Sequence, residues 1–157
     1  MRSRERERFT HGRIWHNGLM LRVKRLSPNA VLPTVAHPGE DLGYDLYSCE
    51  DLTIAARSGT GVRTGIAIEF VPPAGGIVKT RSSLARKRLM CNGGVIDAGY
   101  RGEIVVLIEN LGDTPYEIRK GDKVAQLLEH PFLAGEVVES DLTNAVRGSK
   151  GFGSSGE

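Results

Sequence analysis

The sequence predicts one all-β domain, a sandwich, jelly roll or distorted barrel that carries a single short helix. The chain has 157 residues, which is enough for one hydrophobic core and short for two. It contains 20 Gly and 7 Pro but only 4 Phe, 4 Tyr and 1 Trp, a composition typical of many turns between short strands. Its apolar stretches are correspondingly brief. We therefore expect one site on one domain.

Strands are expected in five apolar stretches, at residues 21–23, 52–54, 64–70, 104–108 and 124–128. In the third stretch, Ile66, Ile68 and Phe70 alternate with Gly, Ala and Glu, which is the pattern of a strand with one buried face. The fourth stretch is apolar at every position, which predicts a strand covered on both faces. Many short strands with one helix favour the all-β architectures named above.

The beginning of the chain differs in charge from the rest. Residues 1–25 hold eight Arg or Lys against two Glu, which leaves 13 basic and 17 acidic residues elsewhere. Residues 1–18 show no sustained apolar period, so a disordered extension is expected there rather than an arm that binds nucleic acid. Residues 19–144 are expected to form the domain, and residues 145–157 a mobile C-terminal flap.

Two cysteines, Cys49 and Cys91, are too few for a disulfide framework and lack the Cys-x-x-Cys spacing of a zinc or redox site. Both are expected to be small buried residues. The longest apolar run, residues 104–108, is far too short to span a bilayer. No secretory signal pattern is present at the N-terminus, so the cytoplasm is the default location and no membrane partner is expected.

Five polar clusters interrupt the apolar pattern, at residues 43–46, 81–85, 93–103, 121–127 and 147–156. The first places Asp45 after a Gly turn, where a turn-capping role is the commoner one for an aspartate. The second places Arg81, Ser82 and Ser83 at the start of a short helix over residues 82–88, with Ser82 or Ser83 as its cap. A forked cation and free N–H groups there suit a phosphate, although a capped helix with a surface arginine explains the segment equally well.

The third cluster runs into the apolar stretch 104–108 and contains Asp97. This aspartate follows two β-branched residues and precedes a turn, so its carboxylate could hold and orient a water at a strand end. A carboxylate is ionised near neutral pH, as a general base has to be. Taken alone, the segment fits a turn-capping aspartate better. Tyr100, three residues later, could form the wall of a sugar pocket.

The last two clusters contain groups that need partners. Gln126 is an amide set among apolar residues, and a buried amide requires protein or ligand hydrogen bonds. The final cluster is rich in Gly, which predicts mobility, but it also carries Arg147, hydroxyl groups and Phe152. A flexible flap that becomes ordered on a phosphate and a base fits this set better than a simple linker does.

In this order and at these spacings, the five clusters resemble the five signature motifs of the trimeric dUTPase family, over roughly residues 21–156. The most specific strings are Gly-Val-Ile-Asp-x-Gly-Tyr-Arg-Gly, at residues 94–102, and Arg-Gly-x-x-Gly-Phe-Gly-Ser, at residues 147–154. The resemblance implies a jelly-roll-like β-barrel in a threefold homotrimer whose active sites draw on all three subunits. It also implies hydrolysis of dUTP to dUMP and diphosphate, with Mg²⁺ bridging the phosphates.

The resemblance further implies a role for each matching residue. Asp97 would orient the water that attacks the α-phosphorus, and Tyr100 would exclude a 2′-hydroxyl from the sugar pocket. Asp45 would reach Mg²⁺ through water. The remaining substrate-binding positions are Arg81, Ser82, Ser83, Gln126 and Arg147 for the phosphates, and Cys91, Asn92, Gly94, Val95, Ile96, Phe152, Gly153 and Ser154 for uracil and its surroundings.

Two positions depart from the family pattern. Ser83 stands where the family commonly has Gly, and the resulting string resembles the related dCTP deaminases. Those relatives carry a catalytic Glu ten residues after the aspartate, where this chain has Leu107, which cannot act as a base. Cys91 stands where many members have Asn. The alternatives are therefore a dCTP deaminase or bifunctional enzyme, and a non-catalytic nucleotide-binding module, for which a carboxylate facing a polyanion would be unnecessary.

Overall fold

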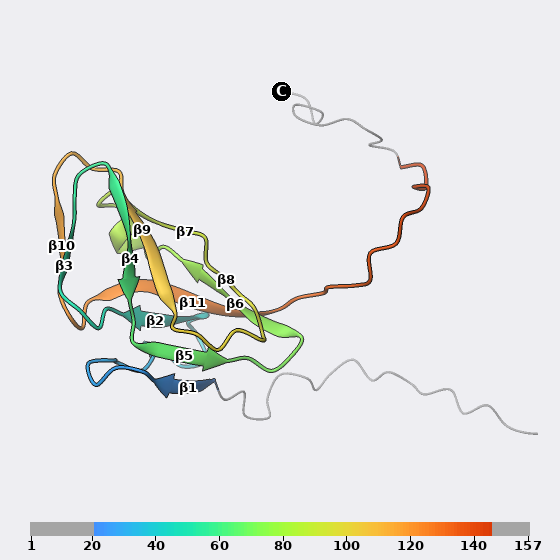
Figure 1. Ribbon diagram of the computed structural model, residues 1–157, viewed down its shortest axis with the longest axis horizontal. Helices are drawn as coiled ribbons and strands as arrows, with labels where there is room; N and C mark the ends of the chain where they lie inside the picture. The colour runs from blue at the N-terminus through green and yellow to red at the C-terminus, as the bar shows by residue number, and fades with distance from the viewer. Residues whose placement is uncertain (1–20, 146–157) are drawn as a thin grey trace, which may run out of the picture.

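The computed structural model describes residues 21–145, which form eleven strands and one four-residue helix (Figure 1). Each of the five stretches expected as strands contributes to one. In chain order the elements are β1 (Arg22–Arg25), β2 (Gly43–Tyr47), β3 (Leu52–Ile54), β4 (Ser58–Arg63), β5 (Ile66–Glu69), β6 (Ala74–Lys79), α1 (Ser82–Ala85), β7 (Leu89–Asn92), β8 (Val95–Ile96), β9 (Val105–Asn110), β10 (Tyr116–Ile118) and β11 (Lys123–Pro131).

The strands pair antiparallel in four separate sheets, and within residues 21–145 they do not close into a single barrel. The largest sheet has the order β2-β11-β6-β8, and a three-stranded sheet has the order β4-β9-β7. Two further pairs, β1 with β5 and β10 with β3, complete the structure. The prediction of an all-β fold with one short helix is confirmed. No helix in the described part of the chain is long and apolar enough to cross a membrane.

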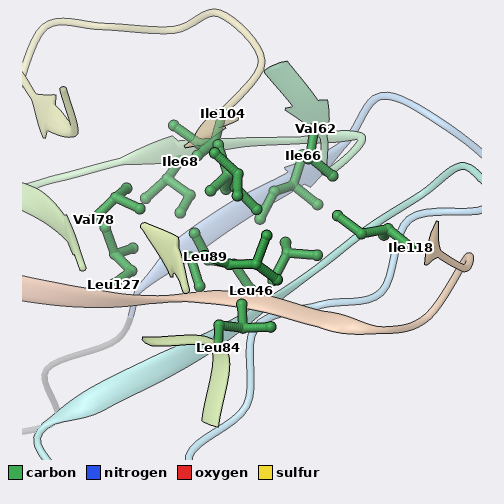
Figure 2. Close-up of a cluster of buried hydrophobic side chains, with 14 of the residues drawn as sticks. Leu46, Val62, Ile66, Ile68, Val78, Leu84, Leu89, Ile104, Ile118 and Leu127 are labelled. Atoms are coloured by element: carbon green, nitrogen blue, oxygen red, sulfur yellow. The ribbon is translucent and has the colours of Figure 1, made fainter. Parts of the chain in front are cut away.

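One hydrophobic core joins the sheets (Figure 2). It draws on every sheet and on α1, whose Leu84 is its buried residue. Fully buried aliphatic side chains such as Leu46, Ile108 and Leu127 each contribute about 1.5–3 kcal/mol relative to exposure. Cys49 belongs to the buried set as predicted, whereas Cys91 is only partly buried.

Two strands differ from the sequence prediction in the faces they bury. In β5, Ala67 is buried along with Ile66 and Ile68, so the strand is covered on both faces rather than on one. In β9 the reverse holds, because Val105 and Leu107 are 40% and 50% exposed between buried neighbours. A run of apolar residues cannot show whether a second layer covers its other face, which is why the prediction for residues 104–108 is wrong for the isolated chain.

The helix is shorter than predicted and is capped differently. It ends at Ala85, and Arg88, at a φ of 61°, turns the chain out of the helical path toward β7. Its N-cap is Arg81, in an extended conformation, and no side chain caps the helix. The expectation that Ser82 or Ser83 caps it is therefore wrong, because the chain leaves β6 extended as far as Arg81.

Beyond β11 the chain runs away from the body as an extended segment (Figure 1). Its residues 132–145 form no regular element. Large apolar side chains in this segment are almost fully exposed, among them Leu133, Val137 and Leu142. An extended segment with exposed apolar side chains is typical of a surface that another protein covers.

Asn110 links the end of β9 to two loops, and its removal is expected to destabilise the fold. Its buried Nδ2 donates to the carbonyls of Ile54, Ala55 and Thr114 at 3.1, 3.2 and 2.8 Å, while Oδ1 accepts from the Gly112 N–H at 3.0 Å. Asn110→Ala removes all four hydrogen bonds and leaves the carbonyl of the buried Ile54 without this donor. We expect a loss of about 2–4 kcal/mol in the free energy of unfolding, measured by urea denaturation.

The matched control for this prediction is Asn29→Ala. Asn29 is exposed, and its side chain makes no hydrogen bond to any residue in the described range. Its replacement should change the free energy of unfolding by less than about 0.5 kcal/mol. Equal stabilities of the two variants would contradict the assigned role of Asn110.

Candidate active site

The largest sheet brings three of the five polar clusters together. β11 lies between β2 and β6, and Gln126 on β11 is paired with Asp45 on one side and with Lys79 on the other. Arg81 follows two residues after Lys79 and turns back toward β2. Together with Lys123, which also contacts Asp45, these residues form a group that we call the Asp45 cluster: Asp45, Arg81, Lys123 and Gln126.

Asp45 is the anion at the centre of this cluster. Its side chain is 12% exposed, and each carboxylate oxygen meets a different cation. Oδ1 lies 2.9 Å from Arg81 Nε, and Oδ2 lies 2.7 Å from Lys123 Nζ. The hydrogen bond and charge of Asp45 raise the pKa of Lys123, so the lysine is protonated at neutral pH. One anion between two cations leaves a net positive charge, which suits a polyanionic ligand.

Ser83 and Gln126 add polar groups beside the two cations. Arg81 Nη1 lies 3.5 Å from Ser83 Oγ, and both Ser82 and Ser83 are exposed. Gln126 Nε2 lies 3.5 Å from the carbonyl of Thr80, a long contact that leaves most of the amide's hydrogen-bonding capacity free. The arrangement therefore offers a guanidinium, the Ser83 hydroxyl and an amide to a phosphate, with the exposed Ser82 between Arg81 and Ser83 in the chain.

Asp97 follows β8, a short strand that ends in a tight turn. The hairpin before it needs glycine at position 94, because φ is +97° and a Cβ would lie 2.8 Å from the carbonyl of Val78. That close approach also lets the Val78 N–H donate to the Gly94 carbonyl at 2.7 Å. Val95 is exposed and Ile96 half-buried, and the Asp97 carbonyl accepts from Tyr100 N–H at 3.0 Å. Asp97 is thus exposed at a strand end, as its sequence context predicts.

Tyr100 folds back over the loop that follows Asp97. Its hydroxyl donates to the Glu103 carbonyl at 3.0 Å, and a Cβ on Gly102 would lie 2.6 Å from its Cζ. Glu103 in turn accepts from the Gly65 N–H at 2.8 Å and pairs with the guanidinium of Arg63 at 3.0 Å. The ring position of Tyr100 therefore depends on the missing side chain at Gly102 and on the anchoring by Glu103.

Cys91 and Asn92, the first two of the residues predicted to lie near uracil, are on β7. Cys91 N–H donates to Thr80 Oγ1 at 2.7 Å, which links β7 to the residue before Arg81. Burial raises the pKa of the Cys91 thiol, so this cysteine is no nucleophile at neutral pH. Asn92 is exposed and its backbone is paired with Leu107. A side-chain amide is therefore available one position after the cysteine.

Asp97 and the Asp45 cluster lie at different ends of the same sheet. The residue before Asp97 is paired with Gly76, near the start of β6, whereas Gln126 is paired with Lys79 at its end. Three residues of extended strand span about 10 Å, and Asp97 lies beyond the level of Gly76. One copy of the chain therefore does not bring Asp97 next to Arg81.

Four predicted site residues, Arg147, Phe152, Gly153 and Ser154, lie outside the described residues. Conversely, the structure identifies three residues that the sequence did not single out: Lys123, Glu103 and Thr80. Lys123 carried a signal, since it lies inside the fourth polar cluster. The contacts of Glu103 and Thr80 join segments far apart in the chain, and no local pattern predicts them.

Comparisons with known proteins agree on one family. The dUTPase family profile matches residues 29–156. The deoxyuridine 5'-triphosphate nucleotidohydrolase of Solibacter usitatus is 41% identical over 142 residues, covering 88% of this chain and 97% of the relative. That of Clostridium kluyveri is 44% identical over 142 residues, with 87% and 97% covered. Among solved structures, the Staphylococcus bacteriophage 80alpha dUTPase with dUPNHPP is similar with a TM-score of 0.82 and 30% identity, over 89% of this chain and all of that one. A phage phi11 dUTPase variant with a structural Mg(II) ion has a TM-score of 0.75 and 26% identity, with 80% and 99% covered.

Proposed function

The chain belongs to the dUTPase family and hydrolyses dUTP, and we propose that it does so at a site assembled from more than one copy of the chain. The observation that carries this proposal is the separation of Asp97 from the Asp45 cluster within one copy. A water-activating carboxylate has to lie within hydrogen-bonding reach, about 2.6–3.2 Å, of the water that attacks the bound phosphate. A neighbouring copy can provide that proximity where a single chain cannot.

In the proposed reaction Asp97 orients a water molecule and accepts its proton as the oxygen attacks the α-phosphorus. The new P–O bond forms on one side while the bond to the bridging oxygen of the diphosphate breaks on the other. Products are dUMP and diphosphate. The exposed position of Asp97 at the end of β8 leaves room for both water and nucleotide.

The Asp45 cluster is the proposed phosphate site. Arg81, Ser82 and Ser83 bind the phosphate chain, and Gln126 contacts the α-phosphate. From the tail, Arg147 is proposed to bind the γ-phosphate. A planar guanidinium can bind two phosphate oxygens at once, which fixes the orientation of the chain as well as its position.

The described residues suit a Mg²⁺ ion that arrives with the triphosphate. Between residues 21 and 145 no three His, Cys, Asp or Glu side chains gather in a way that could hold a metal. Asp45 is already paired with two cations but retains lone pairs for a water molecule. Mg²⁺ keeps several waters and binds readily to phosphates, so Asp45 is proposed to contact it through water. The ion would supply charge neutralisation along the phosphates.

The hairpin around β8 is the proposed uracil and sugar site. The backbone of residues 94–96 reads the edge of uracil, with Cys91 or Asn92 beside it, and Phe152 stacks on the base together with Gly153 and Ser154. Tyr100 packs under the deoxyribose and leaves no space for a 2′-hydroxyl. Tyr100 would thus discriminate against UTP by a steric clash with its 2′-hydroxyl, and not by additional contacts with dUTP.

Gly102→Ala is expected to weaken the discrimination between dUTP and UTP. The added methyl group would displace the Tyr100 ring and loosen the sugar wall. We expect the ratio of kcat/KM for dUTP over UTP to fall at least about tenfold, equivalent to about 1.4 kcal/mol. Steady-state kinetics on both nucleotides measure it.

Gly99→Ala in the same loop is the control for this variant, because a Cβ at Gly99 would meet no atom within 4 Å. Its selectivity should equal that of the wild-type protein. A Gly102→Ala variant with unchanged selectivity would show that Tyr100 does not set the sugar preference.

A jelly-roll-like homotrimer is the proposed assembly, and two surfaces support it. The outer face of β9 presents Val105 and Leu107, which are 40% and 50% exposed, and Leu107 is paired with Gly61 on β4, which has no side chain to cover it. The extended segment after β11 exposes Leu133 and Val137 in the same way. Burying both surfaces against neighbouring copies would remove apolar area from water and close a symmetric ring.

Light scattering at assay concentration is expected to give three times the mass of the 17.0 kDa chain. Leu107→Lys should dissociate the assembly, because it places a charge in the apolar face of β9. Activity should be lost together with the trimer. A catalytically active monomer would refute the shared site.

Substrate choice is tested by measuring diphosphate release from dUTP, dCTP, UTP and dTTP, each with and without Mg²⁺. Only dUTP with Mg²⁺ should be turned over efficiently. Release of ammonia from dCTP would instead indicate the deaminase alternative, which Leu107 disfavours. Nucleotide binding without hydrolysis of any of the four would indicate a regulatory module.

A further inference from the structure

Lys123 approaches Asp45 as closely as Arg81 does, although none of the proposed substrate contacts involves it. Its Nζ lies 2.7 Å from Oδ2, while Arg81 Nε lies 2.9 Å from Oδ1. The two cations therefore use different oxygens of one carboxylate. Asp45 itself is well fixed, because its backbone is paired with Gln126 and its N–H donates to the Thr34 carbonyl at 2.7 Å.

A β-bulge in β11 places Lys123 on this side of the sheet. Asp45 pairs with Gln126 and Leu46 with Ala125, so a regular ladder would pair Tyr47 with Val124. Instead Tyr47 pairs with Lys123, because the register shifts by one residue. Side chains paired directly across two strands lie on the same face, and residues two apart share it as well. Lys123 therefore faces the same side as Asp45.

The same bulge explains two consecutive buried residues in a strand whose side chains should alternate. Val124 and Ala125 are both buried, although a regular strand would direct them to opposite faces. Without the extra residue, Lys123 would lie on the core side of the sheet. Bulges often redirect a side chain next to a functional site, and here the redirected side chain is the lysine.

We propose that Lys123 is a positioning residue for Arg81: by holding Oδ2 of Asp45, it leaves Oδ1 as the oxygen that contacts Arg81 Nε. The Nη groups of Arg81, of which Nη1 lies 3.5 Å from Ser83 Oγ, can then turn to phosphate oxygens. The proposal rests on the proposed function, because it assumes that Arg81 binds the phosphate chain of dUTP.

Removal of Lys123 frees Oδ2. A carboxylate with two free oxygens forms a bidentate pair with a guanidinium, which is the stronger arrangement. Arg81 would then turn an Nη group from the phosphate toward Asp45. The partly buried carboxylate would also lose one of its two compensating charges. The predicted defect is therefore specific to the phosphates and leaves the nucleoside part of the ligand bound as before.

The experiment uses the full chain and two probes, a non-hydrolysable dUTP analogue with an imido-bridged triphosphate and 2′-deoxyuridine, which has no phosphate. Affinities are measured by calorimetry for the first and by NMR titration for the second. Lys123→Met should weaken binding of the triphosphate about tenfold and change binding of deoxyuridine less than about twofold. Lys123→Arg should restore the affinity, because a guanidinium can also donate to Oδ2.

Lys120→Met is the matched control, since it removes one positive charge from the turn that precedes β11. Between residues 21 and 145 the Lys120 side chain forms no ion pair. The affinity of the Lys120→Met variant for both probes should equal that of the wild-type protein. Melting temperatures of all variants separate a loss of folding from a loss of binding.

A double-mutant cycle with Asp45→Asn decides whether Lys123 acts through Asp45. In the Asp45→Asn background, Lys123→Met should have less than about a twofold further effect on triphosphate affinity, because the carboxylate it positions is gone. A full tenfold effect in that background would mean that the lysine contacts phosphate directly, and it would overturn the proposal. So would an unchanged triphosphate affinity of Lys123→Met, or an equal loss for both probes.

Arg81→Ala distinguishes failure of this inference from failure of the proposed function. If Arg81→Ala lowers triphosphate affinity while Lys123→Met does not, the phosphate site stands and the positioning role is wrong. If Arg81→Ala leaves triphosphate affinity unchanged, both the phosphate site and the inference are overturned.

Discussion

Asp97→Asn is expected to reduce kcat for dUTP by about a hundredfold to ten-thousandfold, the range that a general base contributes. The amide has nearly the same size as the carboxylate but can neither accept the proton of the attacking water nor orient it by charge. Binding of a non-hydrolysable dUTP analogue should be retained, so the loss falls on kcat and not on affinity. Steady-state kinetics and calorimetry measure the two quantities.

Asp113→Asn provides the comparison for this variant. Asp113 is an exposed aspartate in a loop and forms an ion pair with Arg57 at the surface, where such pairs contribute little. It should retain wild-type kinetics. If Asp97→Asn kept most of the wild-type kcat, the base would have to be another residue, and the proposed mechanism would be wrong.

Deletion of residues 145–157 is expected to lower kcat and weaken dUTP binding while leaving the melting temperature and the trimer unchanged. It removes Arg147 and Phe152, the proposed contacts to the γ-phosphate and the base. Loss of a base stack alone costs about 1–3 kcal/mol. Loss of the groups that enclose the phosphates should reduce kcat by a further factor of about 100, because the reacting atoms are held less well.

A shorter deletion, of residues 155–157, is the control. The shortened chain ends at Ser154 and keeps every proposed contact of the tail. It should behave as the full-length protein does. Unchanged kinetics of the longer deletion would eliminate the flap. A collapsed melting temperature would show instead that the tail is structural.

Local sequence patterns predicted where the strands lie better than they predicted which faces of the strands are buried. The alternation at Ile66 and Ile68 and the apolar run at 104–108 both marked strands, and both strands are present. The prediction of which faces they bury is wrong in both cases. Burial of Ala67 depends on what packs over β5, whereas Leu107 is exposed because nothing within residues 21–145 forms a second layer over that face of β9. Neither layer is encoded near the strand itself.

The helix shows a second limit of local patterns. Ser82 and Ser83 have the chemistry of N-caps, but the helix begins after Arg81. The pairing of β6 with β11 ends at Lys79, and the backbone is still extended two residues later at Arg81. The extended backbone at Arg81, and not the capping preference of the two serines, sets the start of the helix here.

The sequence by itself determined the all-β class, the family and the identity of the groups that carry the chemistry, because motif residues such as Asp97 and Arg81 are defined by type and spacing. Tertiary structure alone decided how those groups are arranged. The register of β11 between β2 and β6 brings Gln126 and Arg81 to Asp45, and the bulge adds Lys123 to the same face. The pairing of β8 with the start of β6 keeps Asp97 away from them. These relations come from strand register, which depends on hydrogen bonds between segments far apart in the chain, and no local stretch of sequence specifies it.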